Sequence, residues 1–381
     1  MTHPMLRFAL AGAFAGLMLS PSMAQDSVKI ISVVELSGAG ATVGTNFKNG
    51  ADIAVAEINA KGGLFGKKIE ISHNDSQTNP GISRGLIQKA LDDKPYAILG
   101  PVYSGSVKVT AQMTSEAGIA QIVGGEAAEL TQMGMKTLFR TSFGQQSSMP
   151  KIAAYLADDV KAKNVAVVWV NNDFGKGGRD TITKELKARG VNVAADISTE
   201  SGQADFAADV AKVKAANADA VFVYLNEEES ARILKELRKQ DIKAPLIGET
   251  TLLGQKVIDL AGGAANGVKG HVGLTADAPI PAIQEFRNKF NAKYNYVPDH
   301  NGIKGYLAIY MIKAATDKMG KVDAAGLAAA LKNFTITAAK EPGILMDVTI
   351  DEHGDLDRES FLGEVVDGKQ KIVKVLPKLK K

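Results

Sequence analysis

Short apolar runs alternate with helix-forming segments along most of this chain, in two successive series. The apolar runs of the first series are 28–34, 68–72, 96–99, 119–123 and 138–141, and those of the second are 165–170, 191–197, 220–225 and 245–248. Strands that alternate with helices of this length build parallel sheets covered by helices. Two such series predict an α/β fold with two domains, each of ordinary size for a chain of 381 residues.

The last third of the chain has a different pattern. Helices are predicted at 281–294, 303–318 and 324–333, and strands at 344–350, 360–366 and 371–375. No uniformly polar linker separates these segments from the two series. We therefore expect chain that crosses between the two domains and wraps them together, rather than two domains joined by a tether.

The segment 96–126 places two loops at the carboxyl ends of neighbouring predicted strands. Ser104 follows the first strand at the start of a predicted helix, and Gly124 and Gly125 follow the second. This edge of an open α/β sheet binds ligands, and a hydroxyl at a helix N-terminus suits an anion such as a carboxylate. The alternative reading is structural, because a serine at this place commonly caps its own helix.

The N-terminal segment 1–24 is predicted to be a secretory signal. It contains Arg7, a short apolar run at 8–19 and a small-x-small cleavage pattern at 22–24. An apolar run this short is typical of a signal peptide and does not span a bilayer. The net charge is +3, and +2 without this segment, because it holds one arginine and no acid. With no dense basic stripe, this balance argues against a nucleic-acid partner.

The mature chain is expected to be soluble and exported. No later stretch reaches the roughly 18 uninterrupted apolar residues of a transmembrane helix. The sequence contains no cysteine. Disulfides, thiol chemistry and a lipid-bearing cysteine at the cleavage point are therefore excluded.

Motifs of enzyme, cofactor or metal chemistry are not found in the sequence. There is no phosphate-binding loop and no G-x-S-x-G motif, and the five histidines never pair at i, i+4. The glycines at 38–44 lack the standard dinucleotide spacing. The acids at 351–359 lack the glycine and the final glutamate of a calcium loop. We therefore expect no enzyme activity, no cofactor and no metal site.

Several segments together resemble one protein family. They are VKIISVVELSGAGATVGTNFKNGADIAVAEINAKGGLFGKKIEI (28–71), YAILGPVYSGS (96–106), LFRTS (138–142), VAVVWVNNDFGKGG (165–178), ADAVFVYL (218–225) and APLIGET (244–250). This combination resembles the periplasmic solute-binding proteins of branched-chain amino acid ABC transporters, the leucine/isoleucine/valine-binding type. The resemblance covers about residues 28 to 375.

The resemblance implies a type I periplasmic binding protein, with two α/β lobes, three crossovers and a ligand cleft between the lobes. Each lobe would be a mainly parallel sheet flanked by helices. Lobe one is expected at 26–144 plus 274–356, and lobe two at 145–273 plus 357–381. The protein would not be an enzyme. It would be a periplasmic monomer without a lipid anchor that closes on a small ligand and delivers it to an inner-membrane permease.

The resemblance also implies ligand residues, position by position. The carboxylate-binding serine of the family falls on Ser104, and the acids that hold the ligand ammonium fall on Gln145 and Thr250. The lobe-two aromatic residue falls on Phe174. The predicted ligand-binding residues are Tyr103, Ser104, Gly124, Gly125, Glu126, Gln145, Phe174, Asn226, Glu227, Glu249 and Thr250.

These positions depart from the family pattern in a way that concerns charge. Both ammonium-binding acids are lost, and a ligand ammonium in a closed cleft of low dielectric needs a carboxylate partner. The candidate replacements are Glu126, Glu227, Glu228 and Glu249. Glu126 would repel a ligand carboxylate unless a cation lies between them. For the acids at 227–229 the alternative role is a favourable interaction with the dipole of their own helix.

Three functional hypotheses remain open from the sequence. The first is an importer component that binds an amino acid or a related small carboxylate. The second uses the same scaffold for a ligand without an ammonium group, such as an aromatic acid, urea or an amide. The third is a ligand sensor that signals to a membrane receptor.

Overall fold

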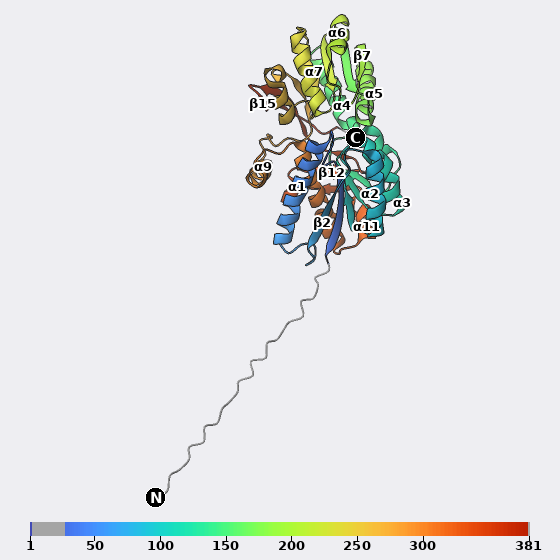
Figure 1. The fold of residues 1–381 in the computed structure, drawn as a ribbon, viewed down its shortest axis with the longest axis vertical. Coiled ribbons are helices and arrows are strands. Elements are labelled where there is room, and N and C mark those ends of the chain that lie inside the picture. The colour runs from blue at the N-terminus through green and yellow to red at the C-terminus, as the bar shows by residue number, and fades with distance from the viewer. Residues whose placement is uncertain (2–26, 380–381) are drawn as a thin grey trace.

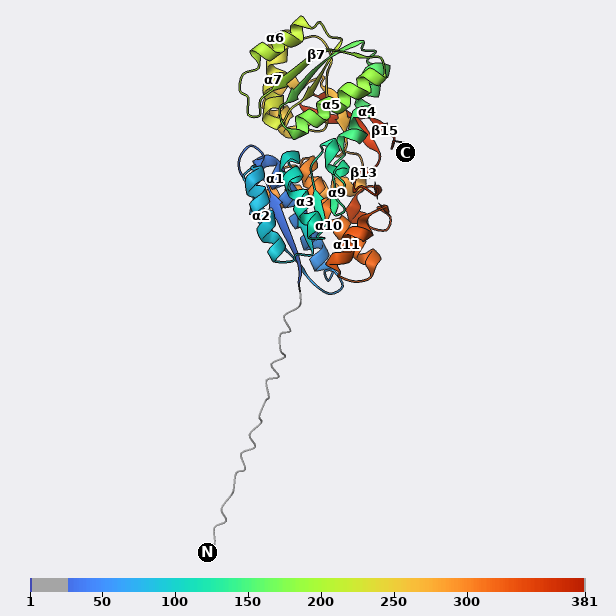
Figure 2. The same ribbon diagram turned by 90° about the vertical axis from the view of Figure 1, so that its right-hand side faces the viewer.

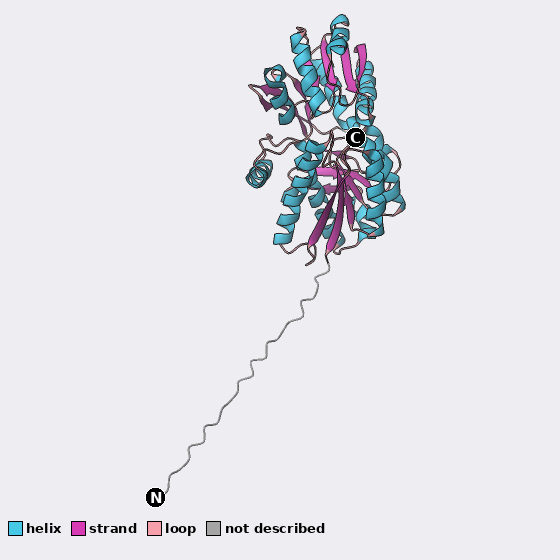
Figure 3. Ribbon diagram, viewed as in Figure 1, coloured by secondary structure: helices cyan, strands magenta, loops and turns pink. Residues whose placement is uncertain are grey.

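The computed structural model describes residue 1 and residues 27–379, so the predicted signal segment 1–24 lies almost entirely outside the described residues. Two α/β lobes lie one above the other (Figure 1), and the view in Figure 2 separates α4–α7 in one lobe from α1–α3, α10 and α11 in the other. Helices cover both faces of each sheet (Figure 3). The predicted fold class is confirmed.

Lobe one is built on a five-stranded parallel sheet with the strand order β2-β1-β3-β4-β5. Its strands are β1 (Val28–Val34), β2 (Ile69–Asp75), β3 (Ala97–Leu99), β4 (Gln121–Val123) and β5 (Leu138–Arg140). They are connected by α1 (Ala41–Ala60), α2 (Pro80–Asp92), α3 (Ser104–Glu116) and the 3₁₀ turn η1 (Ala128–Gln132). Because all five strands are parallel, their carboxyl ends meet at one edge.

The second half of lobe one comes from the last third of the chain. It consists of α9 (Pro281–Tyr294), α10 (His300–Met319), α11 (Ala324–Leu331), η4 (Pro342–Ile344) and a small antiparallel sheet of β11 (Phe334–Ile336), β12 (Val348–Ile350) and β13 (Leu356–Asp357). Helix α10 is buried along most of its length. Its first turns carry the polar residues His300, Asn301 and Lys304.

Lobe two is built on a seven-stranded sheet with the order β15-β14-β10-β9-β8-β6-β7. Its strands are β6 (Asn164–Val170), β7 (Asn192–Thr199), β8 (Ala220–Tyr224), β9 (Leu246–Gly248), β10 (Lys269–Val272), β14 (Ser360–Val366) and β15 (Lys369–Leu376). Its helical segments are α4 (Gln145–Ala154), the π-helical turn η2 (Tyr155–Asp159), α5 (Asp173–Ala188), α6 (Ala207–Ala215), α7 (Glu227–Lys239), α8 (Gln255–Ala261) and η3 (Gly262–Ala265). Strands β14 and β15 pair antiparallel at one edge.

The structure corrects the sequence prediction in several places. The strand predicted at 344–350 is limited to β12, with the 3₁₀ turn η4 ending at Ile344, and β11 and β13 were not predicted. The helix predicted near 148–162 is α4, which ends at Ala154 and continues as a π-helical turn. Strand β10 and helix α8 were not predicted. The β10 sequence Lys-Gly-His-Val has one strongly apolar residue, yet it lies inside the sheet with His271 buried. Burial between two neighbouring strands fixes this segment, and that burial depends on tertiary context.

Helices α1 and α10 pack closely through glycines. A Cβ added at Gly50 would collide with the backbone carbonyl of Gly302, and one added at Gly305 would collide with that of Phe47. We expect Gly50→Ala to lower the free energy of unfolding by about 1–3 kcal/mol, the usual cost of overpacking. Gly85→Ala in α2 is the matched control, because its new Cβ meets nothing within 4 Å.

Chemical denaturation of both variants tests this packing. The control should gain up to about 1 kcal/mol from the better helix propensity of alanine. A Gly50→Ala protein as stable as the Gly85→Ala protein would show that the two helices do not approach through these glycines.

Candidate functional site

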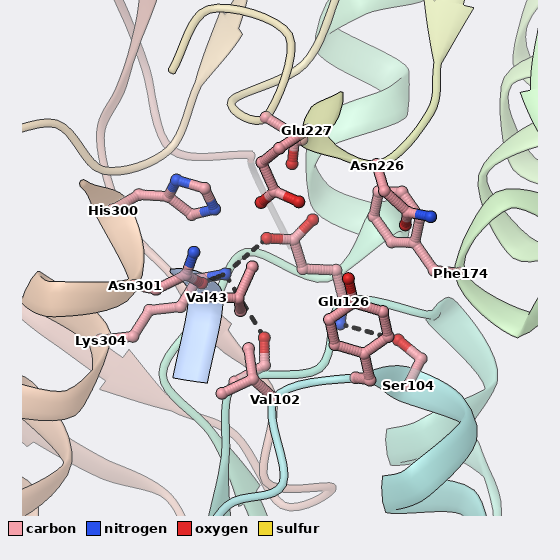
Figure 4. A pocket seen from close by; sticks show the side chains of 13 residues that line it. Val43, Val102, Ser104, Glu126, Phe174, Asn226, Glu227, His300, Asn301 and Lys304 are labelled. Carbon is pink, nitrogen blue, oxygen red and sulfur yellow. Dashed lines mark hydrogen bonds and ion pairs between the residues drawn. The ribbon is translucent and has the colours of Figure 1, made fainter. Parts of the chain in front are cut away.

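A pocket lies between the two lobes, at the carboxyl edge of the lobe-one sheet (Figure 4). The pocket holds about 410 Å³ of empty space, part of which is open to solvent. Both lobes contribute to it, so a ligand here would touch both. The lining residues are Val43, Val102, Tyr103, Ser104, Gly124, Glu126, Phe174, Asn226, Glu227, Thr251, His300, Asn301 and Lys304.

Ser104 is the first residue of α3 and does not cap that helix. The N-cap position is Tyr103, and it makes no side-chain capping bond. The Ser104 hydroxyl instead accepts hydrogen bonds from the backbone N–H groups of Glu126 (3.3 Å) and Ala127 (3.2 Å). Ser104 therefore joins the two loops that follow β3 and β4, and its hydroxyl hydrogen can still be donated to a ligand.

A buried carboxylate holds the loop before α3. Glu35 accepts hydrogen bonds from the backbone N–H groups of Val102 (3.1 Å) and Tyr103 (3.0 Å). Burial raises the pKa of Glu35, although these bonds oppose the shift. Burial likewise raises the pKa of Tyr103, so its phenol stays protonated. Glu35 thus positions the segment that carries two pocket residues.

A ligand carboxylate beside Glu126 would require a nearby cation, and Lys304 provides one in the pocket. Lys304 Nζ lies 2.7 Å from Glu126 Oε1, and both side chains are buried. The same ammonium donates to Asn301 Oδ1 at 3.2 Å and to the Gly124 carbonyl at 3.4 Å. Burial raises the pKa of Glu126, while Lys304 opposes the rise. Lobe one therefore presents an internally neutral ion pair to the ligand.

Lobe two contributes an aromatic ring and an acid. Phe174 stacks on Tyr224 with ring centroids 4.2 Å apart. Glu227 is the first residue of α7, and burial raises its pKa to about 7. Figure 4 shows its carboxylate pointing across the pocket toward that of Glu126. The two lobes thus face each other with one carboxylate each.

The lobes also meet at the rim of the pocket. Lys108 of α3 pairs with Asp173 of α5 at 3.0 Å and with Glu129 at 2.9 Å. These side chains are well exposed, so water screens the pairs and each contributes little to stability. The Lys108–Asp173 pair links the two lobes.

The structure places four of the predicted ligand residues outside this pocket. Gly125 packs against Val107 and Leu130. Gln145 Nε2 donates to the Phe174 carbonyl at 2.7 Å and to the Tyr224 hydroxyl at 3.0 Å within lobe two, while its Oε1 accepts from the lobe-one Ala128 N–H at 3.0 Å. Gly125 is thus closely packed, and the side chain of Gln145 is bound within the protein.

The other two, Glu249 and Thr250, follow β9 and are buried. Glu249 contacts His271 Nδ1 at 2.9 Å and accepts from the Thr250 hydroxyl at 2.9 Å. Burial raises the pKa of Glu249 to about 7 and lowers that of His271 to about 3. Their neighbour Thr251 lines the pocket instead. Glu228, the further candidate acid, is exposed and pairs with Arg232 at 3.0 Å.

Sequence reasoning missed the contribution of α10. His300, Asn301 and Lys304 all line the pocket from its first turns. Burial lowers the pKa of His300 well below its usual value, so its imidazole is neutral. The available signal was the set of polar residues at i, i+1 and i+4 in the otherwise apolar first half of the helix. A lysine buried in such a helix requires a partner.

The described residues were also compared with the requirements of a metal site and of a membrane-spanning helix. No group of three or more His, Cys, Asp or Glu side chains among them is placed to hold a metal ion. Within the same part of the chain, none of the helices is long and apolar enough to cross a membrane.

Two α/β lobes with a polar pocket between them define a bilobal binding protein, and comparison with known proteins identifies its family. The family model described as periplasmic binding protein matches residues 27–370. The chain belongs to this family.

Relatives and solved structures agree with this assignment. The Leu/Ile/Val/Thr-binding protein of Salmonella typhimurium is 28% identical over 359 residues, which cover 92% of this chain and 94% of the relative. The Leu/Ile/Val-binding protein BraC3 of Rhizobium johnstonii is 28% identical, with coverage of 93% and 96%.

Two solved structures share the fold. A branched-chain amino acid transporter substrate-binding protein from Streptococcus pneumoniae, in complex with isoleucine, has a TM-score of 0.81 and 24% identity, with coverage of 92% and 100%. A solute-binding protein of an ABC transporter from R. palustris, in complex with benzoate, has a TM-score of 0.84 and 21% identity, with coverage of 93% and 98%.

Proposed function

We propose that this protein is the periplasmic substrate-binding component of an ABC importer. It binds an amino acid or a related small amino compound between its lobes and delivers it, as a monomer, to an inner-membrane permease. The lobes that we propose are 26–144 plus 274–356 for lobe one and 145–273 plus 357–381 for lobe two. Membership of the periplasmic binding protein family and the named relatives support the class.

The observation that carries the ligand assignment is the pair of facing carboxylates. Glu126 comes from lobe one and Glu227 from lobe two, and both line the same pocket. A ligand nitrogen between them would interact with both lobes only when the cleft is closed. Such a ligand binds the closed state better and shifts the open–closed equilibrium toward it.

A ligand without an ammonium group is the second candidate. The stacked ring of Phe174 in the pocket wall favours it, since an aromatic acid could pack there. The fold neighbour in complex with benzoate shows that this architecture accommodates such a molecule. Under this alternative, the two pocket acids would have no cationic partner on the ligand.

Glu227→Gln distinguishes the two candidates. For an amino ligand, we expect its affinity to fall at least about thirtyfold, because truncating one partner of a buried charge pair costs about 2–5 kcal/mol. Glu228→Gln, one residue along the same helix, is the control and should leave the affinity unchanged. Calorimetric titration of protein that has been unfolded and refolded measures both. Equal affinities of the two variants would remove Glu227 from the site.

The affinity for an amino ligand should depend on pH. Because the pKa of Glu227 is raised to about 7, its carboxyl in the ligand-free protein is protonated below that pH. A cationic nitrogen requires the ionised form, so the dissociation constant should rise by up to about tenfold per pH unit below 7 and level off above it. Titrations across pH 5–9 test this, with Glu227→Gln as the reference that lacks the titration of Glu227.

The pH dependence of folding stability has the opposite sign. A carboxyl whose pKa is raised in the folded state stabilises that state fully only below its unfolded pKa, and this contribution is lost as the pH rises through about 7. Ligand-free protein should therefore lose stability over the same range in which its affinity for an amino ligand improves. An affinity that improves toward acid pH would contradict the assignment of Glu227.

A further inference from the structure

The positive and negative charges of the ionisable side chains that line the pocket do not balance. Glu126 and Glu227 are acids, Lys304 is the one cation among the described lining residues, and His300 is neutral. With both acids ionised, the pocket carries a net charge of −1. Lys304 is already bound to Glu126 at 2.7 Å, whereas no described residue forms an ion pair with Glu227.

Behind the pocket walls, the guanidinium of Arg140 acts on Glu126 but is itself paired with Asp355 at 3.2 Å. The acids Asp299, Glu229 and Glu35 lie near Glu227 or Tyr103. Each raises the pKa of the group that it lies near, as a negative charge does. Glu229 accepts a hydrogen bond from the Gly202 N–H at 2.6 Å, which holds its carboxyl group in place. The surroundings therefore reinforce the negative potential in the pocket.

Many of the donors that a carboxylate ligand would use are already engaged. The backbone N–H of Gly124 donates to the Pro101 carbonyl at 3.3 Å, and those of Glu126 and Ala127 donate to Ser104 Oγ. The three protons of Lys304 have three acceptors within the protein. A ligand carboxylate could enlist Lys304 only by sharing it with Glu126.

We propose that the ligand of this pocket carries a net charge of +1. Its cationic nitrogen lies between Glu227 and the Glu126–Lys304 pair, and the ligand either lacks a carboxylate or carries a second cationic group that balances one. This inference rests on the proposed function, because it concerns the same pocket. It narrows the ligand from amino compounds in general to small organic cations, either amines or basic amino acids.

Charge balance is the physical reason. A bound monocation pairs with Glu227 and leaves the Glu126–Lys304 pair intact, so no charge is unpaired in the closed cleft. A zwitterion brings a carboxylate as well, and that carboxylate and Glu126 would then share a single ammonium. An uncompensated buried charge is costly, so the first arrangement is favoured.

Matched ligands of different charge test the inference by calorimetric titration of refolded protein. Leucine, 3-methylbutylamine and 4-methylpentanoate share one branched side chain and carry net charges of 0, +1 and −1. Norvaline and ornithine differ by one terminal amino group, with net charges of 0 and +1. We expect the amine or ornithine to bind at least about tenfold tighter than its zwitterionic partner, a difference of about 1.4 kcal/mol.

Glu227→Gln provides a second readout, because it makes the net charge of the pocket zero. The ratio of cation affinity to zwitterion affinity should fall at least about tenfold in this variant. Glu228→Gln, whose side chain is exposed and paired with Arg232, should keep the wild-type ratio.

The possible failures are distinguishable. Tighter binding of leucine and norvaline than of both cations would overturn the charge inference and leave the proposed function standing. Tightest binding of 4-methylpentanoate, or no binding of any amine or amino acid at millimolar concentration, would overturn both. An unchanged preference in Glu227→Gln would overturn the role given to that carboxylate.

Discussion

Replacing Lys304 with methionine is expected to lower the free energy of unfolding by about 3–5 kcal/mol near neutral pH. The substitution removes the cation 2.7 Å from the buried Glu126 carboxylate and leaves that carboxylate without an ionic partner. Burial already raises the pKa of Glu126, so the variant should bind a proton there at mildly acidic pH. The loss measured by urea unfolding should therefore be smaller at about pH 5 than at about pH 8.

Two further variants make this expectation specific. Adding Glu126→Gln to Lys304→Met should recover much of the loss, because the two residues interact directly. Lys239→Met removes a lysine whose side chain is 74% exposed and should change stability by less than about 1 kcal/mol. A Lys304→Met protein as stable as the Lys239→Met protein would mean that Glu126 and Lys304 do not form a buried pair.

Arg140→Met is expected to have a comparable effect on stability and to weaken ligand binding as well. The Arg140 side chain is fully buried and pairs with Asp355 at 3.2 Å. Its guanidinium also donates to the carbonyls of Gly125 (3.4 Å), Glu126 (3.1 Å) and Ala127 (3.1 Å). Loss of these contacts removes the cation beside the buried Asp355 carboxylate and should cost about 3–5 kcal/mol.

Ligand binding should suffer because the same carbonyls belong to the loop that carries Glu126. Urea unfolding and calorimetric titration measure the two effects separately. Arg189→Met, which removes only a surface pair with Asp158 at 3.5 Å, is the control. Unchanged ligand affinity in an Arg140→Met protein that still folds would show that this loop keeps its shape without the guanidinium.

The fold could be predicted from the sequence because its signals are local. The predicted bounds of β1, α9 and β14 match those in the structure. At α2, Asn79 caps the helix by accepting hydrogen bonds from the Gly81 and Ile82 N–H groups. Apolar periodicity, caps and turn residues act over a few positions, so they can be recognised without knowing the tertiary contacts.

The ligand pocket could be predicted only in part. Seven of the predicted ligand residues line it, all at strand ends or helix starts: Tyr103, Ser104, Gly124, Glu126, Phe174, Asn226 and Glu227. Their roles toward a ligand stay predictions. Lys304 was not predicted as a pocket residue because its role depends on pairing with Glu126, 178 positions earlier in the chain. Likewise, nothing near Glu249 in the sequence indicates that His271 takes its carboxylate instead of a ligand.

The central claim, that the cleft closes on a small amino compound, is tested most directly by a thermal-shift panel on protein that has been unfolded and refolded to remove carried-over ligand. The panel holds amino acids, amines, aromatic acids, amides and urea. At a thousandfold excess over its dissociation constant, a ligand adds about 4 kcal/mol of stability and should raise the midpoint by several degrees. The account predicts such a shift with amino compounds in the wild type and its loss in Glu227→Gln. A shift only with compounds that lack an amino group would contradict it.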